Sequence, residues 1–378
     1  MRVGIVGASA SGVYTAMLMK RLHPEWDVAV FDHAPKLARK LYATGNGHCN
    51  LLNAAIDPNK YSNPDFVANV IADRPLEYWV GLLNEFGIAT TRVGDLIYPL
   101  TYSASSYVNA LSSVLNRVGA KVHLGCEVKG YSVSKSISVE TSEGNFEFDR
   151  IVIACGGKSQ KNLGSDGSLF AILSAHGYEI SPLLPGLCPI KTKEQPKSLD
   201  GLRHKALVKL IRNGETLYEE RGEVLFRKDG LSGIAIFNLA SIIARHGVKN
   251  EYTVSLDLFP NITHDELGLI VLQAKKEFAE DYLSTIVEKP LAEYISRQGG
   301  DSIKAMKDMR FRFTELSSFE QSQVTVGGVK LSEISANLES KRENGVFFAG
   351  EVLDIDGLCG GFNLGWCLFS AARVAESL

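Results

Sequence analysis

The stretch that decides the fold is MRVGIVGASASG, residues 1–12. The apolar run Val3–Val6 predicts a buried strand, and a helix is expected after the glycine turn, from about Ser11 to Leu22. Pro24 closes this helix, and a second strand is expected over Asp27–Phe31. A strand, a glycine-rich turn, a helix and a second strand in this order are typical of the first βαβ unit of a dinucleotide-binding domain.

The turn from Gly7 to Gly12 has glycine at both ends and Ser9 where the usual fingerprint has its middle glycine. Glycine in such a turn allows a tight bend, close approach of the backbone to a pyrophosphate and close packing of helix on strand. The start of the helix then offers free N–H groups and a positive dipole end to the phosphates. With Ser9 in it, the turn alone leaves the nature of the ligand open.

Asp32 supplies the second part of this signal. It stands 20 residues after Gly12, at the end of the second expected strand. An acidic side chain at this place binds the ribose hydroxyls of an adenosine, and it repels the 2′-phosphate of NADP. The ordinary alternative is a solvated carboxylate after a strand. The motif does not distinguish NAD from FAD.

A second block follows soon after, with two cations and a glycine-rich loop. Arg39 and Lys40 precede the run Thr44–Asn50, which contains a Gly-X-Gly turn. Such a loop suits the phosphates and the ring of a bound flavin. On spacing alone an ordinary polar loop explains it better, with His48 on the surface and Cys49 as a small buried residue.

Two later strands end in small residues. Ile151–Ala154 is fully apolar and runs into Cys155-Gly156-Gly157, whose small side chains would let a nucleotide pass close to the backbone. Gly345–Ala349 is followed by Gly350-Glu351 and then, through Gly360 and Gly361, by a helix expected from about Asn363 to Leu378. A helix that points its positive end at N1 and C2=O of a flavin favours the reduced, anionic ring. An NAD dehydrogenase needs no such terminal strand and helix, whereas an FAD protein does, so the combination predicts FAD.

The rest of the chain predicts an insert. Helices are expected at 66–88 and 103–118, and short strands at 120–124, 127–133, 136–141 and 145–148. From about Cys188 the sequence pattern changes and predicts short strands at 188–193, 206–212, 216–220 and 223–226. Residues 263–310 are charged and have the periodicity of helices. We therefore expect an FAD-binding domain of 1–187 and 325–378, an inserted β-rich domain of 188–260 and 311–324, and a helical subdomain of 261–310.

Composition limits the classes of partner. The formal net charge of −3 gives no basic footprint for nucleic acid or anionic membrane. The start of the chain reads as a strand rather than a secretory signal, and the longest apolar run, Gly233–Ala244, is too short to cross a bilayer. The six cysteines form no CxxC pair, so neither a zinc ribbon nor a thioredoxin-type disulfide is encoded. We expect a reduced, cytoplasmic protein with no metal site.

Six blocks together resemble a known family and fall in its order: GASASG (7–12), RKLYATGNGHCN (39–50), GDLIYP with SASS (94–99 and 103–106), IVIACGGKS (151–159), GLSG (230–233) and GEVLDIDGLCGGFN (350–363). The family is that of bacterial flavoproteins known as aminoacetone oxidases or NAD(P)/FAD-dependent oxidoreductases, and it includes the 3-dehydro-bile-acid reductase. The resemblance covers nearly the whole chain. It implies an α/β fold, with a Rossmann-type FAD-binding domain split between both chain ends, an inserted β-barrel-like domain and a helical subdomain that caps the flavin.

The chain departs from the family near the expected flavin ring. The family usually has glycine at the position of Ser9, glutamate at Asp32 and arginine at His48. Cys359 and Phe362 stand where the family often has threonine and tyrosine. These differences bear on the choice of substrate more than on cofactor binding.

The expected activity is hydride transfer through flavin N5 to or from a small or planar organic substrate, as a reductase that takes electrons from NAD(P)H bound only transiently. The alternatives are an aminoacetone-type amine oxidase that releases hydrogen peroxide, and a non-catalytic flavin-binding redox sensor. A flavin-dependent RNA-modifying enzyme would need a basic groove that the charge balance does not indicate. No second strand–GxGxxG–helix unit is found, and the oligomeric state stays open.

The candidate catalytic residues are His48, Cys49 and Cys359, with Asn363 and Tyr98 or Tyr102 as further candidates at the ring; an imidazole titrates near neutrality and so suits acid or base catalysis. The candidate cofactor-binding residues are Gly7, Ser9, Ala10, Ser11, Gly12, Asp32, His33, Arg39, Lys40, Thr44, Gly45, Asn46, Gly47, Cys49, Asn50, Val128, Ala154, Cys155, Gly156, Gly350, Glu351, Gly361, Phe362 and Asn363.

Overall fold

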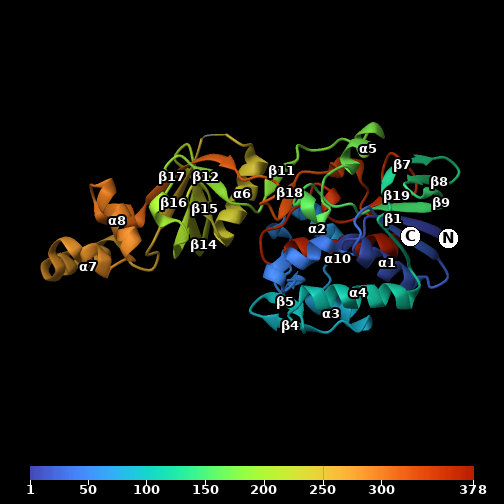
Figure 1. Cartoon of the computed structure of the whole chain (residues 1–378), viewed down its shortest axis with the longest axis horizontal. Coiled ribbons are helices and arrows are strands. Elements are labelled where there is room, and N and C mark those ends of the chain that lie inside the picture. The colour runs from blue at the N-terminus through green and yellow to red at the C-terminus, as the bar shows by residue number, and fades with distance from the viewer. Residues whose placement is uncertain (250) are drawn as a thin grey trace. The chain divides into compact units, whose positions relative to one another are not determined.

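The computed structural model describes residues 1–249 and 251–378, which form two compact units (Figure 1). The first unit consists of Met1–Leu184 and Gln323–Leu378, and the second consists of Pro185–Ser322. Each unit has a hydrophobic core of its own. The predicted fold class, a split Rossmann-type domain with an inserted barrel and added helices, is confirmed.

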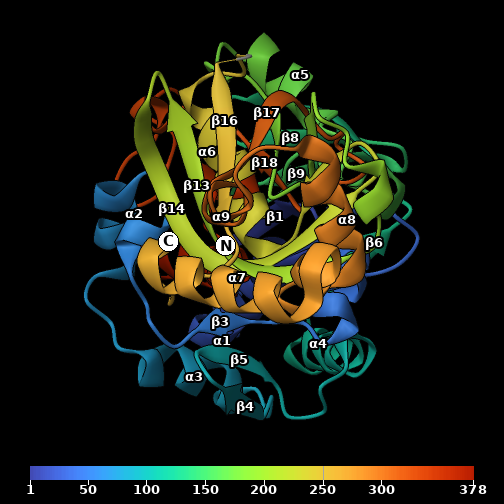
Figure 2. The same ribbon diagram turned by 90° about the vertical axis from the view of Figure 1, so that its left-hand side faces the viewer.

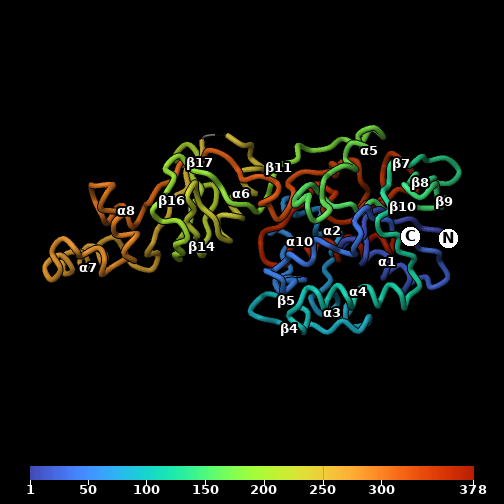
Figure 3. Tube along the Cα trace, in the orientation of Figure 1, coloured from blue at the N-terminus to red at the C-terminus, as the bar shows by residue number. Residues whose placement is uncertain are grey.

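The first unit is organised by a five-stranded parallel sheet in the order β19-β10-β1-β2-β6. Its strands are β1 (Arg2–Val6), β2 (Asp27–Asp32), β6 (Lys121–Leu124), β10 (Arg150–Ile153) and β19 (Val346–Phe348). The central strands are apolar because both faces of the sheet are covered, and Val3, Ile5 and Val30 are fully buried. Figure 3 shows the blue start and the red end of the chain running together through this unit.

Helices from the two chain ends pack on each other beside this sheet. Helix α1 (Ala10–Leu22) lies against α10 (Phe362–Ser377) and α4 (Ala104–Val118). The hydroxyls of Tyr14 and Tyr107 join α1 to α4 at 2.6 Å, and both side chains are buried. The expected helix at 66–88 is two helices, α2 (Pro64–Ile71) and α3 (Leu76–Glu85), because Ala72 takes a left-handed φ of 53°.

The first unit also contains two small antiparallel sheets and short helical segments. One sheet has the order β3-β5-β4 and the other β7-β8-β9. The strands are β3 Leu52–Asn53, β4 Thr90–Val93, β5 Leu96–Pro99, β7 Val128–Val133, β8 Ile137–Thr141, β9 Gly144–Phe148 and β18 Val324–Val326, and the helix is α5 Leu169–Ala175. The 3-10 turns are η1 Arg39–Gly47, η2 Pro58–Lys60, η3 Lys161–Leu163, η6 Leu331–Glu333 and η7 Gly350–Val352. Strand β11 (Leu184–Gly186) begins at the last residue of this stretch of the first unit.

The second unit is built on a closed barrel in the order β12-β15-β14-β13-β16-β17, with antiparallel pairing (Figure 2). Its strands are β12 (Ile190–Thr192), β13 (Arg203–Arg212), β14 (Glu215–Arg227), β15 (Gly230–Ser232), β16 (Tyr252–Asp257) and β17 (Met309–Leu316). The two strands expected at 216–220 and 223–226 are one strand. Gly222 lies between them, and a side chain there would meet the Cβ of Ala235 at 3.1 Å.

Helices complete the second unit. The apolar run at 233–244 is helix α6 (Ile234–His246), which packs on β14; it was not among the expected elements. The charged region 263–310 contains α7 (His264–Phe278), the 3-10 turn η5 (Ala279–Thr285), α8 (Lys289–Gln298) and α9 (Ser302–Lys307). A further 3-10 turn, η4 (Lys197–Leu199), precedes β13. Within the described residues, no helix is long and apolar enough to cross a membrane.

Candidate functional site

The turn after β1 has a shape that only glycine permits at its two ends. Gly7 has a φ of +110°, and a Cβ on it would lie 2.4 Å from the carbonyl oxygen of Ala154. A Cβ on Gly12 would lie 1.8 Å from the carbonyl oxygen of Gly7. The bare backbone therefore lets α1 start directly at the carboxyl edge of the sheet, as a dinucleotide site requires.

The start of α1 is prepared for an anion. Ser9 is the N-cap residue, and its hydroxyl makes no capping hydrogen bond. The first turn contains no acidic residue, and the first N–H groups of a helix have no partner within it. Their partial positive charge, added to the helix dipole, suits a phosphate group.

The C-terminal part of the chain closes the same site. Gly350 has a φ of +79°, and a Cβ on it would lie 2.6 Å from the hydroxyl of Ser11. The Ser11 hydroxyl in turn points to the carbonyl oxygen of Ala154, at 3.5 Å. The ends of β1, β10 and β19 thus meet around the first turn of α1. These bare backbone approaches form a cradle that fits the pyrophosphate of FAD.

Glu351 holds a lysine in place. Its Oε2 lies 2.9 Å from the Nζ of Lys40, and both side chains are mostly buried. Its Oε1 accepts the N–H of Thr325 at 2.7 Å. We expected Glu351 at the cofactor; the contacts with Lys40 and Thr325 hold its carboxylate in place, and its further lone pairs can still accept a ligand, so this stays a prediction. It is Lys40 that brings a positive charge to this edge, while Arg39 donates to the carbonyl oxygen of Asn162 at 2.7 Å.

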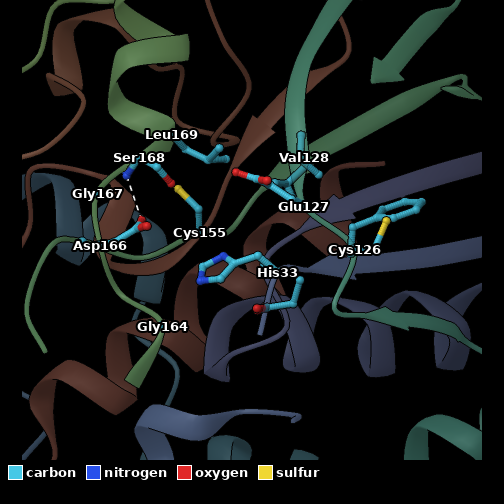
Figure 4. Close-up of a pocket in the computed structure, with 15 residues that line it drawn as sticks. His33, Cys126, Glu127, Val128, Cys155, Gly164, Asp166, Gly167, Ser168 and Leu169 are labelled. Carbon is cyan, nitrogen blue, oxygen red and sulfur yellow. Dashed lines mark hydrogen bonds between the residues drawn. The ribbon is translucent and has the colours of Figure 1, made fainter. Parts of the chain in front are cut away.

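A pocket opens beside Asp32 at the same edge of the sheet (Figure 4). Figure 4 shows the side chains of His33, Glu127 and Asp166 around it. The pocket is lined by Val6, Gly7, Phe31, Asp32, His33, Cys126, Glu127, Val128, Cys155, Gly157, Gly164, Asp166, Gly167, Ser168 and Leu169. Of the sequence candidates, the structure thus brings together Gly7, Asp32, His33, Val128 and Cys155.

The carboxylate of Asp32 is fixed by the backbone. One oxygen accepts the N–H of Ala8 at 2.7 Å and the other accepts the N–H of Ala34 at 2.8 Å. A carboxylate has further lone pairs, so both oxygens can still accept hydroxyl groups of a ribose. The geometry fits the adenosine end of a dinucleotide.

Asp166 is a residue that the sequence analysis missed. Partial burial alone would raise its pKa, but hydrogen bonds from Ser168 and the charges of His33 and Lys161 hold the pKa below its ordinary value. The neighbouring hydroxyl of Ser165 is buried and has no hydrogen-bond partner. The Gly-Ser-Asp-Gly run at 164–167 is the sequence signal that could have drawn attention to this loop.

The loop after Lys40 has a chain of left-handed residues, namely Gly45, Asn46, Gly47 and Cys49, with φ of 55°, 53°, 87° and 59°. It is tied to the start of α10 by Asn50. The amide oxygen of Asn50 accepts the N–H of Gly361 at 3.0 Å and its nitrogen donates to the carbonyl of Leu52 at 3.0 Å. The Thr44 hydroxyl donates to the carbonyl of Leu41 at 2.7 Å. The side chains of Asn50 and Thr44 thus hold this loop in shape, and the predicted contact of both residues with the cofactor stays a prediction.

The backbone at the start of α10 is also fixed by close packing and hydrogen bonds. Gly361 has a φ of +91°, and a Cβ on it would lie 2.4 Å from the carbonyl carbon of Leu52. The amide of Asn363 bonds the backbone of Gly357 on both sides, at 2.9 and 2.8 Å. Phe362 is buried, and its carbonyl accepts the hydroxyl of Tyr61 at 2.9 Å. Asn363 therefore shapes the loop before α10 rather than presenting a free amide.

His48 and two tyrosines form a ring cluster next to this loop. The Nδ1 of His48 lies 2.8 Å from the carbonyl oxygen of Tyr102. The rings of His48 and Tyr102 meet edge to face, and Tyr102 stacks on Tyr98 with centroids 5.0 Å apart. Three of the candidates near the ring are thus neighbours.

The cysteines give little support to cysteine chemistry. Cys49 is fully buried, and burial raises its pKa to about 11, so it is a protonated thiol rather than a nucleophile. Burial raises the pKa of Cys155 to about 12 as well. None of the six cysteines is in a disulfide; Cys359 lies partly exposed before Gly360. Among the described residues no group of His, Cys, Asp or Glu is arranged to hold a metal ion.

Comparison with known proteins identifies the family and the fold of the chain. The family model for the HI0933-like protein Rossmann domain matches residues 1–377. A 3-dehydro-bile acid delta(4,6)-reductase of Clostridium scindens is 31% identical over 97% of this chain and 96% of its own length. A ribosomal RNA dihydrouridine synthase of Haemophilus influenzae is 28% identical over 99% of this chain and 97% of its own.

The solved structure of a 3-ketosteroid-delta4-(5alpha)-dehydrogenase from Rhodococcus jostii RHA1 has the same fold, with a TM-score of 0.52 at 11% identity; the match covers 99% of this chain and 96% of that one. The predicted class of enzyme, an FAD-dependent oxidoreductase, is confirmed. The chain belongs to the HI0933-like family of Rossmann-domain proteins.

Proposed function

We propose that this protein reduces a carbon–carbon double bond conjugated to a carbonyl group in a small, planar organic molecule, with NAD(P)H as the electron donor. One observation carries the proposal. Two relatives that match nearly the whole chain have names describing this one type of reduction. A 3-oxo Δ4,6 steroid and a uracil base both contain a double bond in conjugation with a carbonyl.

The residues described above have the following proposed roles. The amides at the start of α1 and the charge of Lys40 hold the pyrophosphate, and Asp32 receives the adenosine ribose. The start of α10 directs its positive end at the flavin ring. Bound FAD supplies the hydride. The sequence contains no second dinucleotide-binding turn for NAD(P)H, so this electron donor would bind only transiently.

A small molecule is the preferred substrate because the charges of the chain are balanced. The formal net charge is −3, with 40 cationic and 43 acidic residues. Tight binding to RNA depends on an excess of positive charge along the contact. The second candidate is nevertheless reduction of a uridine in ribosomal RNA, because the Haemophilus influenzae relative has that name and matches 99% of this chain.

The first experiment is anaerobic stopped-flow absorbance of the FAD-loaded protein. NADH or NADPH should bleach the flavin band, and a 4-en-3-one steroid or a cyclic enone should restore it faster than air does. If neither nucleotide bleaches the band and aminoacetone does so with release of peroxide after aeration, the protein is an oxidase and the proposal is wrong.

A second arm separates the two reductase candidates. The reduced protein is mixed with unmodified ribosomal RNA, and dihydrouridine is measured by mass spectrometry of its nucleosides. Dihydrouridine at a defined position, with no reoxidation by any enone, would replace the small-molecule proposal by the RNA candidate. If NADH or NADPH reduces the flavin but neither enones nor ribosomal RNA reoxidise it, the protein would instead be a redox sensor.

A further inference from the structure

His48, Tyr98 and Tyr102 form a cluster of neighbouring rings, with the imidazole at one end. Tyr102 stacks on Tyr98 with their planes only 24° apart, and His48 meets Tyr102 at 5.9 Å between centroids. His48 is exposed, and Tyr102 is 37% exposed. The imidazole and part of the Tyr102 side chain are therefore open to a ligand.

The imidazole has a defined orientation. A carbonyl oxygen only accepts hydrogen bonds, so the contact between Nδ1 and the carbonyl of Tyr102 places a hydrogen on Nδ1. Tyr102 is held in a left-handed conformation, with a φ of 51°, by the bond from its N–H to the carbonyl of Pro99 at 2.9 Å. Nε2 is then the atom at which this imidazole gains or loses its second proton.

The ring cluster is connected to the start of α10 through the loop from Gly45 to Asn50. Gly45 is in contact distance of the Tyr98 ring, since a Cβ on it would lie 3.8 Å from that ring. The same loop continues to Asn50, which accepts the N–H of Gly361. One connected loop thus leads from the ring cluster to the helix start that faces the flavin in our assignment.

Other side chains at this end are poorly suited to deliver a proton. Cys49 is buried, and the amide of Asn363 is bonded to Gly357. Burial raises the pKa of Tyr98 above its ordinary value, which makes its hydroxyl a weaker acid. The imidazole contacts the ring and the carbonyl of Tyr102, and Tyr102 in turn stacks on Tyr98; both of these tyrosines are titratable.

We infer that His48 is the general acid of the reduction and protonates the α-carbon of the substrate from Nε2. This inference rests on the proposed function.

The step balances as follows. Bound, reduced FAD would supply a hydride that forms the C–H bond at the β-carbon, and the π electrons would shift to give an enolate. The Nε2–H bond of the imidazolium breaks, its proton forms the C–H bond at the α-carbon, and neutral imidazole remains. The exposed ring is protonated again from water. The substrate gains two electrons and two hydrogens, and NAD(P)H is the reductant that restores the flavin.

The test separates the two half-reactions in the variants His48→Asn and His48→Gln. The side-chain amide of asparagine can still donate to the carbonyl of Tyr102, so the loop keeps its anchor, but neither amide delivers a proton. Bleaching by the nicotinamide and reoxidation by ferricyanide, which needs no proton at carbon, should stay within twofold of the parent. Reoxidation by the enone should slow by about 10²–10³-fold, within the usual range for a general acid.

The matched control is His246→Gln. His246 is also exposed and its Nδ1 also contacts a backbone carbonyl, that of Ile242 at 3.0 Å, but it lies in the second unit outside the proposed site. It should behave like the parent in all three reactions. In the parent the enone step should lose rate as pH rises, and this dependence should be absent in His48→Asn.

Each outcome has one meaning. If the parent reduces enones and both His48 variants do so at the parent rate with the parent pH profile, the inference is wrong and the proposed function stands. If the parent reduces no enone, the proposed function itself fails. If a variant loses FAD, the test is repeated with FAD-loaded His48→Ala and added imidazole. Restoration of the rate of enone reduction would support His48 as the general acid, and no restoration would overturn this inference.

Discussion

Gly12 shows how a single missing Cβ decides whether a cofactor can bind. We predict that Gly12→Ala weakens FAD binding by tenfold or more and destabilises the protein by about 1–3 kcal/mol, the usual cost of overpacking. The reason is the 1.8 Å approach of the new Cβ to the carbonyl oxygen of Gly7, which would push α1 off the sheet edge. Quenching of flavin fluorescence and urea unfolding measure the two effects.

The control for this substitution is Gly81→Ala. Gly81 lies inside α3, and nothing stands within 4 Å of the place where its Cβ would be. Alanine has the higher helix propensity, so this change should stabilise the protein by about 0.5–1 kcal/mol and leave FAD affinity unchanged. Equal effects of the two substitutions would contradict the role assigned to Gly12.

Cys49 is predicted to be dispensable for catalysis. Cys49→Ala removes a buried, protonated thiol, so FAD affinity and the rates of both half-reactions should stay within about twofold of the parent. A loss of stability of about 1 kcal/mol is expected from the small cavity. The measurement is stopped-flow reduction and reoxidation of the purified variant. A hundredfold loss in either rate would return Cys49 to the catalytic candidates.

At the scale of elements, the pair of Lys40 and Glu351 joins η1 to the segment that follows β19. Lys40→Met leaves the carboxylate of Glu351 without its cation while both groups are mostly buried. We expect a destabilisation of about 1–3 kcal/mol and weaker FAD binding, because the phosphates lose a positive charge. Denaturant unfolding and FAD titration at low and high salt test this.

An exposed pair serves as the comparison for that prediction. Arg297 and Glu293 lie 3.3 Å apart in α8, and their side chains are 67% and 50% exposed. Arg297→Met should change stability by less than about 0.5 kcal/mol. If Lys40→Met is as mild as Arg297→Met, then Lys40 has no special part in the site.

The elements also show what sequence could and could not predict. The βαβ unit, the terminal strand and the closing helix were predictable because their apolar runs and glycines follow from backbone packing at the sheet edge. The break between α2 and α3 and the joined strand β14 were not, since a left-handed Ala72 and a glycine inside a strand carry no distinct local signal.

The candidate site, too, could be predicted from the sequence only in part. The sequence indicates which loops gather, but it does not tell which side chains remain free for a ligand. Asn50 and Asn363 are predicted at the cofactor, and the amides of both are bonded to backbone groups: Asn50 to Leu52, Ile97 and Gly361, and Asn363 to Gly357 six residues earlier. Asp166 was missed because its place in the pocket depends on a loop that is distant from Asp32 in the chain.

At the scale of the whole molecule, the two units have separate cores and only the first carries the proposed FAD site. A ligand that binds the native state at one hundred times its Kd adds about 2.7 kcal/mol of stability. We predict that FAD slows hydrogen exchange in β1, β10 and β19 and leaves the barrel strands β13 and β16 unchanged. Hydrogen exchange with mass spectrometry measures this, and equal protection of both units would contradict it.

The position of β19 in the sheet also determines the order in which the two units can fold during translation. β19 pairs with β10, which the ribosome makes almost 200 residues earlier, and the entire second unit is translated between them. Until β19 emerges, the nascent chain has an open sheet edge at β10 and no Gly350 to close the phosphate cradle. The barrel unit can therefore fold on the ribosome first, whereas the proposed FAD site is complete only after β19 and Gly350 have been translated.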